Sequence, residues 1–214
     1  MNKLKALDEQ AFWWINSHHN TALDWGMWSV SQWWFWLVVI ALVMFLVTLR
    51  KDRGNWMWVL LGIALCFLIA DQISSNVIKD GVQRLRPCHA LENVRMFHTT
   101  KGGLYGFVSS HAANAFAVAM FISLTYGGRH GSSLRPAENN DKSLRDAESY
   151  HDRTPWIPVL MMGWAVVCSY SRPYLGKHYP GDIICGALLG LGIGALVYFV
   201  ISKIKLFIAS RSSR

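Results

Sequence analysis

Residues 171–182 read SRPYLGKHYPGD and lie between two long apolar runs, Trp156–Tyr170 and Ile183–Ile201. Apolar runs of this kind are typical of membrane-spanning helices, so the polar stretch is expected to connect two of them. Pro180 suits the first turn of the helix that follows. A polar loop between membrane helices would also account for the stretch, so its chemistry must be weighed with the rest of the chain.

Three side chains in this stretch have spacings suited to phosphate chemistry. His178 and Asp182 are four residues apart, a spacing that can bring their side chains together. A carboxylate on one imidazole nitrogen fixes the tautomer and leaves the other nitrogen free to attack. Arg172 carries a guanidinium that can bind a phosphate through two parallel hydrogen bonds.

Two further stretches support the phosphate interpretation. Residues 79–87 read KDGVQRLRP, and residues 108–111 read VSSH. Together with residues 171–182 they resemble, in order, the three signature motifs of the type 2 phosphatidic acid phosphatase (PAP2) family: K-x6-R-P, P-S-G-H and S-R-x5-H-x3-D. The first and third motifs match at every fixed position. The second matches only at serine and histidine, because Val108 and Ser110 replace the family's proline and glycine.

The resemblance implies a membrane lipid phosphatase with a covalent mechanism. His178 would attack phosphorus to form a phosphohistidine, Asp182 would orient it, and His111 would protonate the leaving oxygen and later activate water. The expected phosphate-binding residues are Lys79, Arg86, Ser109, Ser110 and Arg172. Cations and the amides that begin a helix suit the charge that develops in phosphoryl transfer. The sequence has no carboxylate cluster of the metal-site type, so we expect no metal and no cofactor.

Composition indicates a membrane protein. Hydrophobic residues make up 52% of the chain, and many of the eleven tryptophans lie near the ends of apolar runs, as in an interfacial aromatic belt. The net charge of +8 could suggest nucleic acid, but the basic residues are scattered between apolar runs, which favours membrane topology and anionic headgroups instead. The expected partners are therefore the bilayer and a lipid phosphate substrate, not nucleic acid.

The predicted fold is all-α, a single domain over residues 1–214 that forms an integral-membrane helical bundle. We expect about five transmembrane helices, each of roughly 20 residues, and an N-terminal interfacial helix within residues 1–27. Residues 128–154 are predicted to form a polar cytoplasmic loop. Asp71, in the second apolar run, is expected to face the bundle interior, since an ionisable side chain is costly in lipid. The expected spans are 28–49, 56–78, 111–127, 156–170 and 183–201.

This arrangement places all three motifs on one side of the membrane. The majority of the 21 Lys and Arg residues fall on the opposite side. By the positive-inside rule, the active site should face outward, into the periplasm, from the inner (cytoplasmic) membrane of a bacterium.

The sequence leaves the substrate and the reaction class partly open. The stretch GGLYGFVSSHAAN, residues 102–114, is most similar to the branches of the family that act on lipid A or undecaprenyl diphosphate. A phosphotransferase would use the same histidine and differ only in its product. A non-enzymatic lipid transporter is a third hypothesis, under which Asp71 would be essential and His178 dispensable.

Overall fold

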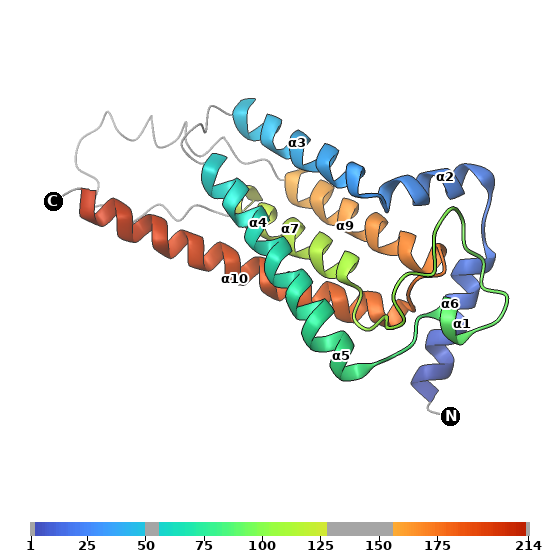
Figure 1. The fold of residues 1–214 in the computed structure, drawn as a ribbon. Coiled ribbons are helices and arrows are strands. Elements are labelled where there is room, and N and C mark those ends of the chain that lie inside the picture. Colours follow the sequence, from blue (N-terminus) through green and yellow to red (C-terminus); the bar gives the residue numbers. More distant parts are fainter. Residues whose placement is uncertain (1–2, 50–55, 128–155, 213–214) are drawn as a thin grey trace.

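The computed structural model describes residues 3–49, 56–127 and 156–212. These ranges are almost entirely helical, with one isolated β-bridge between Leu85 and Tyr105. The main helices pack lengthwise into a bundle (Figure 1). The predicted all-α membrane bundle is thereby confirmed. The main helices are α3 (Trp33–Leu49), α4 (Trp56–Gln72), α7 (Ser110–Gly127), α9 (Trp156–Tyr174) and α10 (Pro180–Ser212).

Shorter elements gather at one end of the bundle. α1 (Lys3–Ser17), α6 (Pro87–Ala90) and the connection between α5 and α7 lie at this end, with the N-terminus, whereas the C-terminus lies at the other end (Figure 1). The remaining short elements are α2 (Thr21–Val30), the π-helix η1 (Ile73–Ile78) and α5 (Lys79–Val82).

The N-terminal region differs from the single interfacial helix predicted within residues 1–27. It forms two helices, because Asn20 adopts an extended backbone and its side chain accepts a hydrogen bond from the amide of Leu23, which starts α2. The first predicted span, 28–49, is also wrong at its start. The chain bends by 67° between Val30 and Trp33, so α2 takes the first residues of that span and α3 the rest.

Three predicted helix ends also move outward. The second span continues past residue 78 to Val82 through the π-helix. α9 continues past Tyr170 and is followed by Gly176, whose φ of 77° suits the end of a helix. α10 continues past Ile201 because its basic final turns are favourable at a helix C-terminus. The predicted cytoplasmic loop, 128–154, lies outside the described residues.

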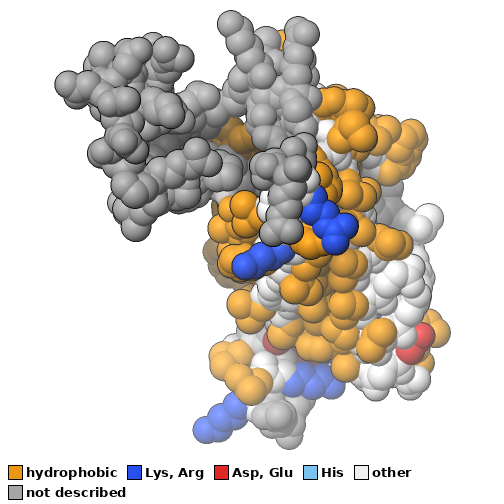
Figure 2. Space-filling view, turned by 90° about the vertical axis from the view of Figure 1, so that its left-hand side faces the viewer, with side chains coloured by type: hydrophobic (Ala, Val, Ile, Leu, Met, Phe, Trp, Pro, Cys, Tyr) orange, Lys and Arg blue, Asp and Glu red, His pale blue; other side chains and the backbone are white. Residues whose placement is uncertain are grey.

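The predicted number of spans, about five, stays a prediction. Within the described residues, two helices are long and apolar enough to cross a membrane, Trp56–Val82 and Pro180–Arg211, and the bent pair α2–α3 raises the number to three. α7 falls short of this measure because alanine and polar residues make up much of its length. Exposed large hydrophobic side chains lie on α3, α4, α9 and α10, and Figure 2 shows hydrophobic side chains over much of one face, as a lipid-facing surface requires.

Asp71 does not face the bundle interior as predicted. It is exposed, accepts a hydrogen bond from Ser75 in its own helix (3.5 Å), and lines a groove with residues of α4 and α7 that include Gln72 and Asn114. The groove and the neighbouring serine give the carboxylate polar surroundings without burial.

Three glycines of α10 allow close packing against α7. A Cβ on Gly186 would lie 2.7 Å from the carbonyl oxygen of Ser109, just before α7, and a Cβ on Gly190 or Gly194 would lie 2.3 Å from a backbone oxygen of α7. Their four-residue spacing places them on one helix face. Gly192, on another face, has nothing within 4 Å of such a Cβ. The glycines that pack against α7 therefore form one stripe, which does not include Gly192.

Gly190→Ala is expected to destabilise the bundle, because its methyl group would overlap the carbonyl oxygen of Ala113. Overpacking of this kind costs about 1–3 kcal/mol, and each kcal/mol lowers Tm by about 2–4 °C in a chain of this size. Thermal unfolding in detergent measures the loss. Gly192→Ala is the matched control and should keep the Tm of the unchanged protein; equal losses in the two variants would contradict the packing described.

Candidate active site

His178 and Asp182 form the centre of the site. His178 lies in the connection that precedes α10 and is 2% exposed, and Asp182 lies in the first turn of α10 and is fully buried. The Nδ1 atom of His178 is 3.5 Å from Oδ2 of Asp182, an ion-pair distance that is longer than a hydrogen bond. Such contacts are often long without substrate. The backbone amide of Tyr179 donates to the same Oδ2 (3.0 Å) and fixes its orientation.

The other ring nitrogen of His178 faces a cation. Nε2 lies 3.2 Å from Nη1 of Arg86. Because a guanidinium only donates, we assign the lone pair to Nε2 and the proton to Nδ1, on the Asp182 side. Burial, and then the charges of Arg86 and Arg172, hold the pKa of His178 well below its usual range. The imidazole is therefore neutral at pH 7, with an unprotonated nitrogen beside a cation that can bind phosphate.

Arg172 is a buried cation without a counter-charge. It lies in the last turn of α9, is 7% exposed, and makes no hydrogen bond or ion pair with its side chain among the described residues. Its charge acts on both His178 and His111. Burying an unpaired guanidinium costs free energy unless an anion binds beside it.

His111 occupies the first turn of α7, on another side of the site. Its ring lies edge-on to Trp36 at 6.3 Å and interacts electrostatically with the backbone of Ser31, at the bend between α2 and α3. It also interacts electrostatically with His178. The two histidines therefore come from separate elements but act on each other.

Lys79 is held at the edge of the site by the second motif. Its Nζ donates to the hydroxyl of Ser110 (2.5 Å), which also bonds to Ser74 (2.8 Å) and Ser75 (3.1 Å) of the π-helix. Ser110 stands where the PAP2 motif has glycine. Its hydroxyl therefore ties the start of α7 to the segment that carries Lys79, a use that the motif pattern alone did not predict.

Ser109 joins α7 to α10. Its backbone amide donates to the carbonyl of Asp182 (3.1 Å), and its hydroxyl accepts a hydrogen bond from the amide of Ala112 (3.4 Å). The hydroxyl proton remains available to an anion. Ser109 is fully buried, so an anion that contacts it must enter the site.

The eight residues selected from the sequence therefore lie at the same end of the bundle, on five separate segments. Contacts or electrostatic interactions connect seven of them: Lys79, Arg86, Ser110, His111, Arg172, His178 and Asp182. Ser109 is linked to them through the carbonyl of Asp182.

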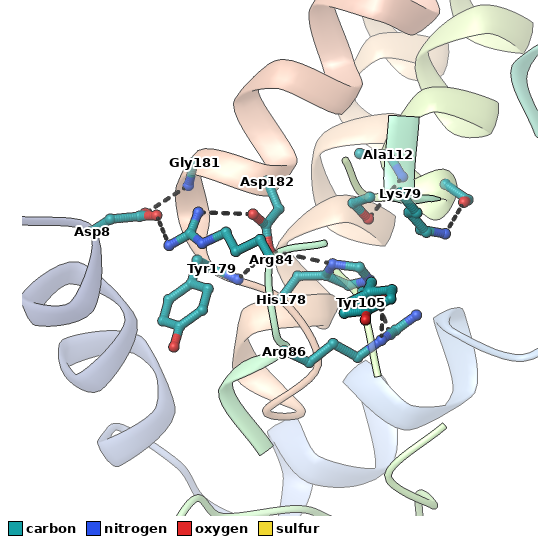
Figure 3. Close-up of polar contacts among 12 residues, drawn as sticks. Asp8, Lys79, Arg84, Arg86, Tyr105, Ala112, His178, Tyr179, Gly181 and Asp182 are labelled. Atoms are coloured by element: carbon teal, nitrogen blue, oxygen red, sulfur yellow. Dashed lines mark hydrogen bonds and ion pairs between the residues drawn. The ribbon is translucent and has the colours of Figure 1, made fainter. Parts of the chain in front are cut away.

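Sequence reasoning missed other members of the site. Arg84 is a variable position of the first motif, yet its Nη1 donates to Oδ1 of Asp182 (2.9 Å) (Figure 3). Gly106 packs over the histidine and aspartate: a Cβ there would lie 3.2 Å from Oδ2 of Asp182. Lys177 is 6% exposed, and burial and Arg172 lower its pKa to about 8. Arg84 and Lys177 are both basic residues at variable positions of the motifs, and this is the sequence signal that could have identified them.

Known proteins resemble this chain over most of its length. The model of the PAP2 superfamily matches residues 55–205, which include all three motifs. A lipid A 4'-phosphatase of Bacteroides thetaiotaomicron is 28% identical over 94% of this chain and 80% of its own length. A lipid A 4'-phosphatase of Porphyromonas gingivalis is 26% identical over 99% of this chain and 78% of its own length.

Two solved structures share the fold. A crystal structure of LpxE from Aquifex aeolicus has a TM-score of 0.57 at 22% identity and covers 89% of this chain and 94% of that chain. A transmembrane PAP2-type phosphatidylglycerolphosphate phosphatase from Bacillus subtilis has a TM-score of 0.61 at 19% identity, over 97% of this chain and 89% of that chain. With the family model matching most of its length, this chain belongs to the PAP2 superfamily.

Proposed function

We propose that this protein is a phosphatase of lipid A or a related lipid phosphate. It acts at the outer face of the bacterial inner membrane, through a phosphohistidine at His178 and without a metal ion. The family and the lipid A 4'-phosphatase relatives support a lipid phosphatase.

One observation carries the proposal: the buried guanidinium of Arg172 has no counter-charge among the described residues. Arg86 and Lys79 repel it electrostatically, so three cations converge on one small region. The carboxylate of Asp182 is already occupied by Arg84 and the amide of Tyr179. A bound phosphate would supply the missing negative charge, and the unprotonated Nε2 of His178 lies beside it.

The first chemical step follows from this placement. Nε2 of His178 attacks phosphorus, an N–P bond forms, and the P–O bond to the lipid breaks. His111 gives its proton to the leaving lipid oxygen. Lys79, Arg86 and Arg172 stabilise the charge on the equatorial oxygens, and the Asp182 carboxylate stabilises the proton on Nδ1 as the ring becomes cationic.

The second step returns the enzyme to its starting state. His111, now unprotonated, takes a proton from water, and the resulting hydroxide attacks the phosphohistidine. The N–P bond breaks, inorganic phosphate leaves, and Nε2 of His178 regains its lone pair. The same two histidines therefore serve both steps with no net change in the protein.

Two lines of argument support the substrate and its location. The lipid A 4'-phosphatases match nearly the whole chain, including the N-terminal helices outside the family model. In the five-span topology predicted from the sequence, the basic residues fall mostly on the side opposite the motifs, and the positive-inside rule then favours a periplasmic site.

A phosphate-release assay on detergent-purified protein tests this function. The substrates are lipid A, undecaprenyl diphosphate, phosphatidate and phosphatidylglycerol phosphate, each assayed with and without a second lipid as acceptor. We expect lipid A to be the best substrate and inorganic phosphate to be the product. Preference for another lipid would correct the substrate, transfer to the acceptor lipid would establish a phosphotransferase, and no release from any lipid by folded protein would contradict a phosphatase.

Metal removal should leave the reaction unchanged, because Lys79, Arg86 and Arg172 provide the positive charge that a metal supplies in other phosphatases. We expect EDTA to leave phosphate release unchanged and vanadate, a mimic of five-coordinate phosphorus, to inhibit it. Initial rates across a titration of each reagent measure both effects. Inhibition by EDTA that added divalent metal reverses would contradict the proposed mechanism.

A further inference from the structure

The N-terminal helix reaches the active site through one side chain. Asp8 of α1 accepts a hydrogen bond from Nη2 of Arg84 (2.7 Å), and Nη1 of the same guanidinium donates to Asp182 (2.9 Å). Figure 3 shows Arg84 between the two carboxylates. One guanidinium therefore bridges the carboxylate that faces His178 and a carboxylate that lies 174 positions earlier in the chain.

Arg84 is held on three sides. Besides the two carboxylates, its guanidinium lies over the ring of Tyr179, 4.0 Å from the ring centroid. The Arg84 and Asp8 side chains are 25% and 15% exposed, so water reaches this end of the bridge, whereas Asp182 is fully buried. Without Asp8, Nη2 of Arg84 would lose its carboxylate partner on the solvent-exposed side. The guanidinium would then be free to turn away from Asp182.

Asp8 also contacts the start of α10. Its Oδ1 accepts a hydrogen bond from the amide of Gly181 (2.7 Å), one of the amides that a helix start leaves without an intrahelical partner. A Cβ on Gly181 would lie 2.8 Å from Oδ2 of Asp8, so glycine allows this approach. Asp8 thus binds both Arg84 and the helical turn that carries Asp182.

We propose that Asp8 is a positioning residue for phosphoryl transfer: it fixes Arg84 and, through Arg84, the Asp182 carboxylate that orients His178. This inference rests on the proposed function. It gives α1 a role in turnover, although Asp8 lies outside the residues that the family model matches.

The primary test is Asp8→Asn, which keeps the shape of the side chain and an acceptor for Gly181 but removes the charge that holds Arg84. We expect kcat for the lipid phosphate to fall about 10-fold, the scale of lost supporting contacts. KM should change less than about twofold, because Asp8 does not contact the proposed phosphate site. The inference would be overturned if kcat is unchanged, including the case in which kcat/KM falls only because KM rises.

Asn16→Ala separates positioning from the docking of α1. Asn16 is buried in the same helix and donates to the backbone carbonyls of Arg95 (3.0 Å) and Tyr174 (2.9 Å), with no contact to Arg84. We expect this variant to lower Tm but to keep kcat within about twofold in folded protein. If Asn16→Ala lowers kcat as much as Asp8→Asn does, Asp8 acts only by docking the helix.

A double-mutant cycle tests whether Asp8 acts through Arg84. Arg84→Met should itself lower kcat, and adding Asp8→Asn should then lower it by less than about twofold, since the contact is already lost. Gly181→Ala provides an independent variant that pushes the Asp8 carboxylate away and should reproduce the loss. Independent, multiplicative losses from Asp8→Asn and Arg84→Met would overturn the inference.

The outcome for Asp8 is distinguishable from the outcome for the function as a whole. If unchanged protein releases no phosphate from any lipid, the proposed function fails. If unchanged protein is active, His178→Ala is inactive and Asp8→Asn retains full kcat, the function stands and only the role of Asp8 is wrong.

Discussion

Replacing His178 with alanine is expected to lower phosphate release by roughly 10⁴-fold or more, the scale seen when a covalent nucleophile is removed. Its Nε2 faces the cation Arg86 and its Nδ1 faces Asp182, so removing the ring removes the proposed nucleophile. Initial rates of phosphate release from lipid A measure the effect, with the melting temperature confirming that the variant is folded.

His19→Ala is a control for the loss of a histidine as such. His19 is exposed between α1 and α2, away from the contacts that define the site. It should retain nearly full activity. A His178→Ala variant that keeps more than a tenth of the activity would exclude His178 as the nucleophile, and with it the covalent mechanism.

Gly106→Ala is expected to lower turnover by about 10²-fold, because small misplacements of catalytic groups have effects of this size. The added Cβ would lie 3.1 Å from Cγ of Arg86, 3.2 Å from Oδ2 of Asp182 and 3.5 Å from Nδ1 of His178. The first two contacts are tighter than ordinary packing, so the methyl group must push apart the cation and the carboxylate on either side of the imidazole.

Gly103→Ala is the matched control for this variant. It lies in the same connection, and nothing lies within 4 Å of a Cβ built on it. We expect Gly103→Ala to keep kcat within about twofold, as surface changes usually do. Equal losses in Gly103→Ala and Gly106→Ala would indicate that the connection is merely sensitive to substitution, rather than that Gly106 packs over the catalytic pair.

Fixed spacings made much of the candidate site predictable. The four-residue spacing of His178 and Asp182 brings the two together across the start of α10, and the first motif places both Lys79 and Arg86 at the same end of the bundle. The roles of these residues remain predictions. These residues could be selected because three motifs occur in the order found in the family. A polar loop between helices would not contain such an ordered set of motifs by chance.

Other members of the site depend on contacts that no local pattern encodes. Asp8 meets Arg84 across 76 positions of the chain, and Arg84 meets Asp182 across 98. From sequence, Asp8 was one acidic residue among several on an amphipathic helix. No motif position marks Gly106, whereas in the structure its small size lets the backbone pack against Asp182 and His178.

The predicted helix boundaries were wrong for a related reason. Apolar runs indicate where a helix can span but not where it ends. The Asn20 cap divides the predicted N-terminal helix, and the bend after Val30 divides the first predicted span. Charges at the end of α10, in contrast, do not stop a helix whose C-terminus favours them. Local caps and bends, rather than hydropathy, therefore set the boundaries near the site.

The most direct test of the central claim is to trap the covalent intermediate. Purified protein would be mixed with lipid A carrying labelled phosphate, quenched in alkali within the first turnovers and digested, and the labelled peptide sequenced by mass spectrometry. We expect one phosphoryl group on His178 in the unchanged protein and none in the His178→Ala variant. Label on any other residue, or phosphate release at the normal rate with His178 absent, would contradict the mechanism.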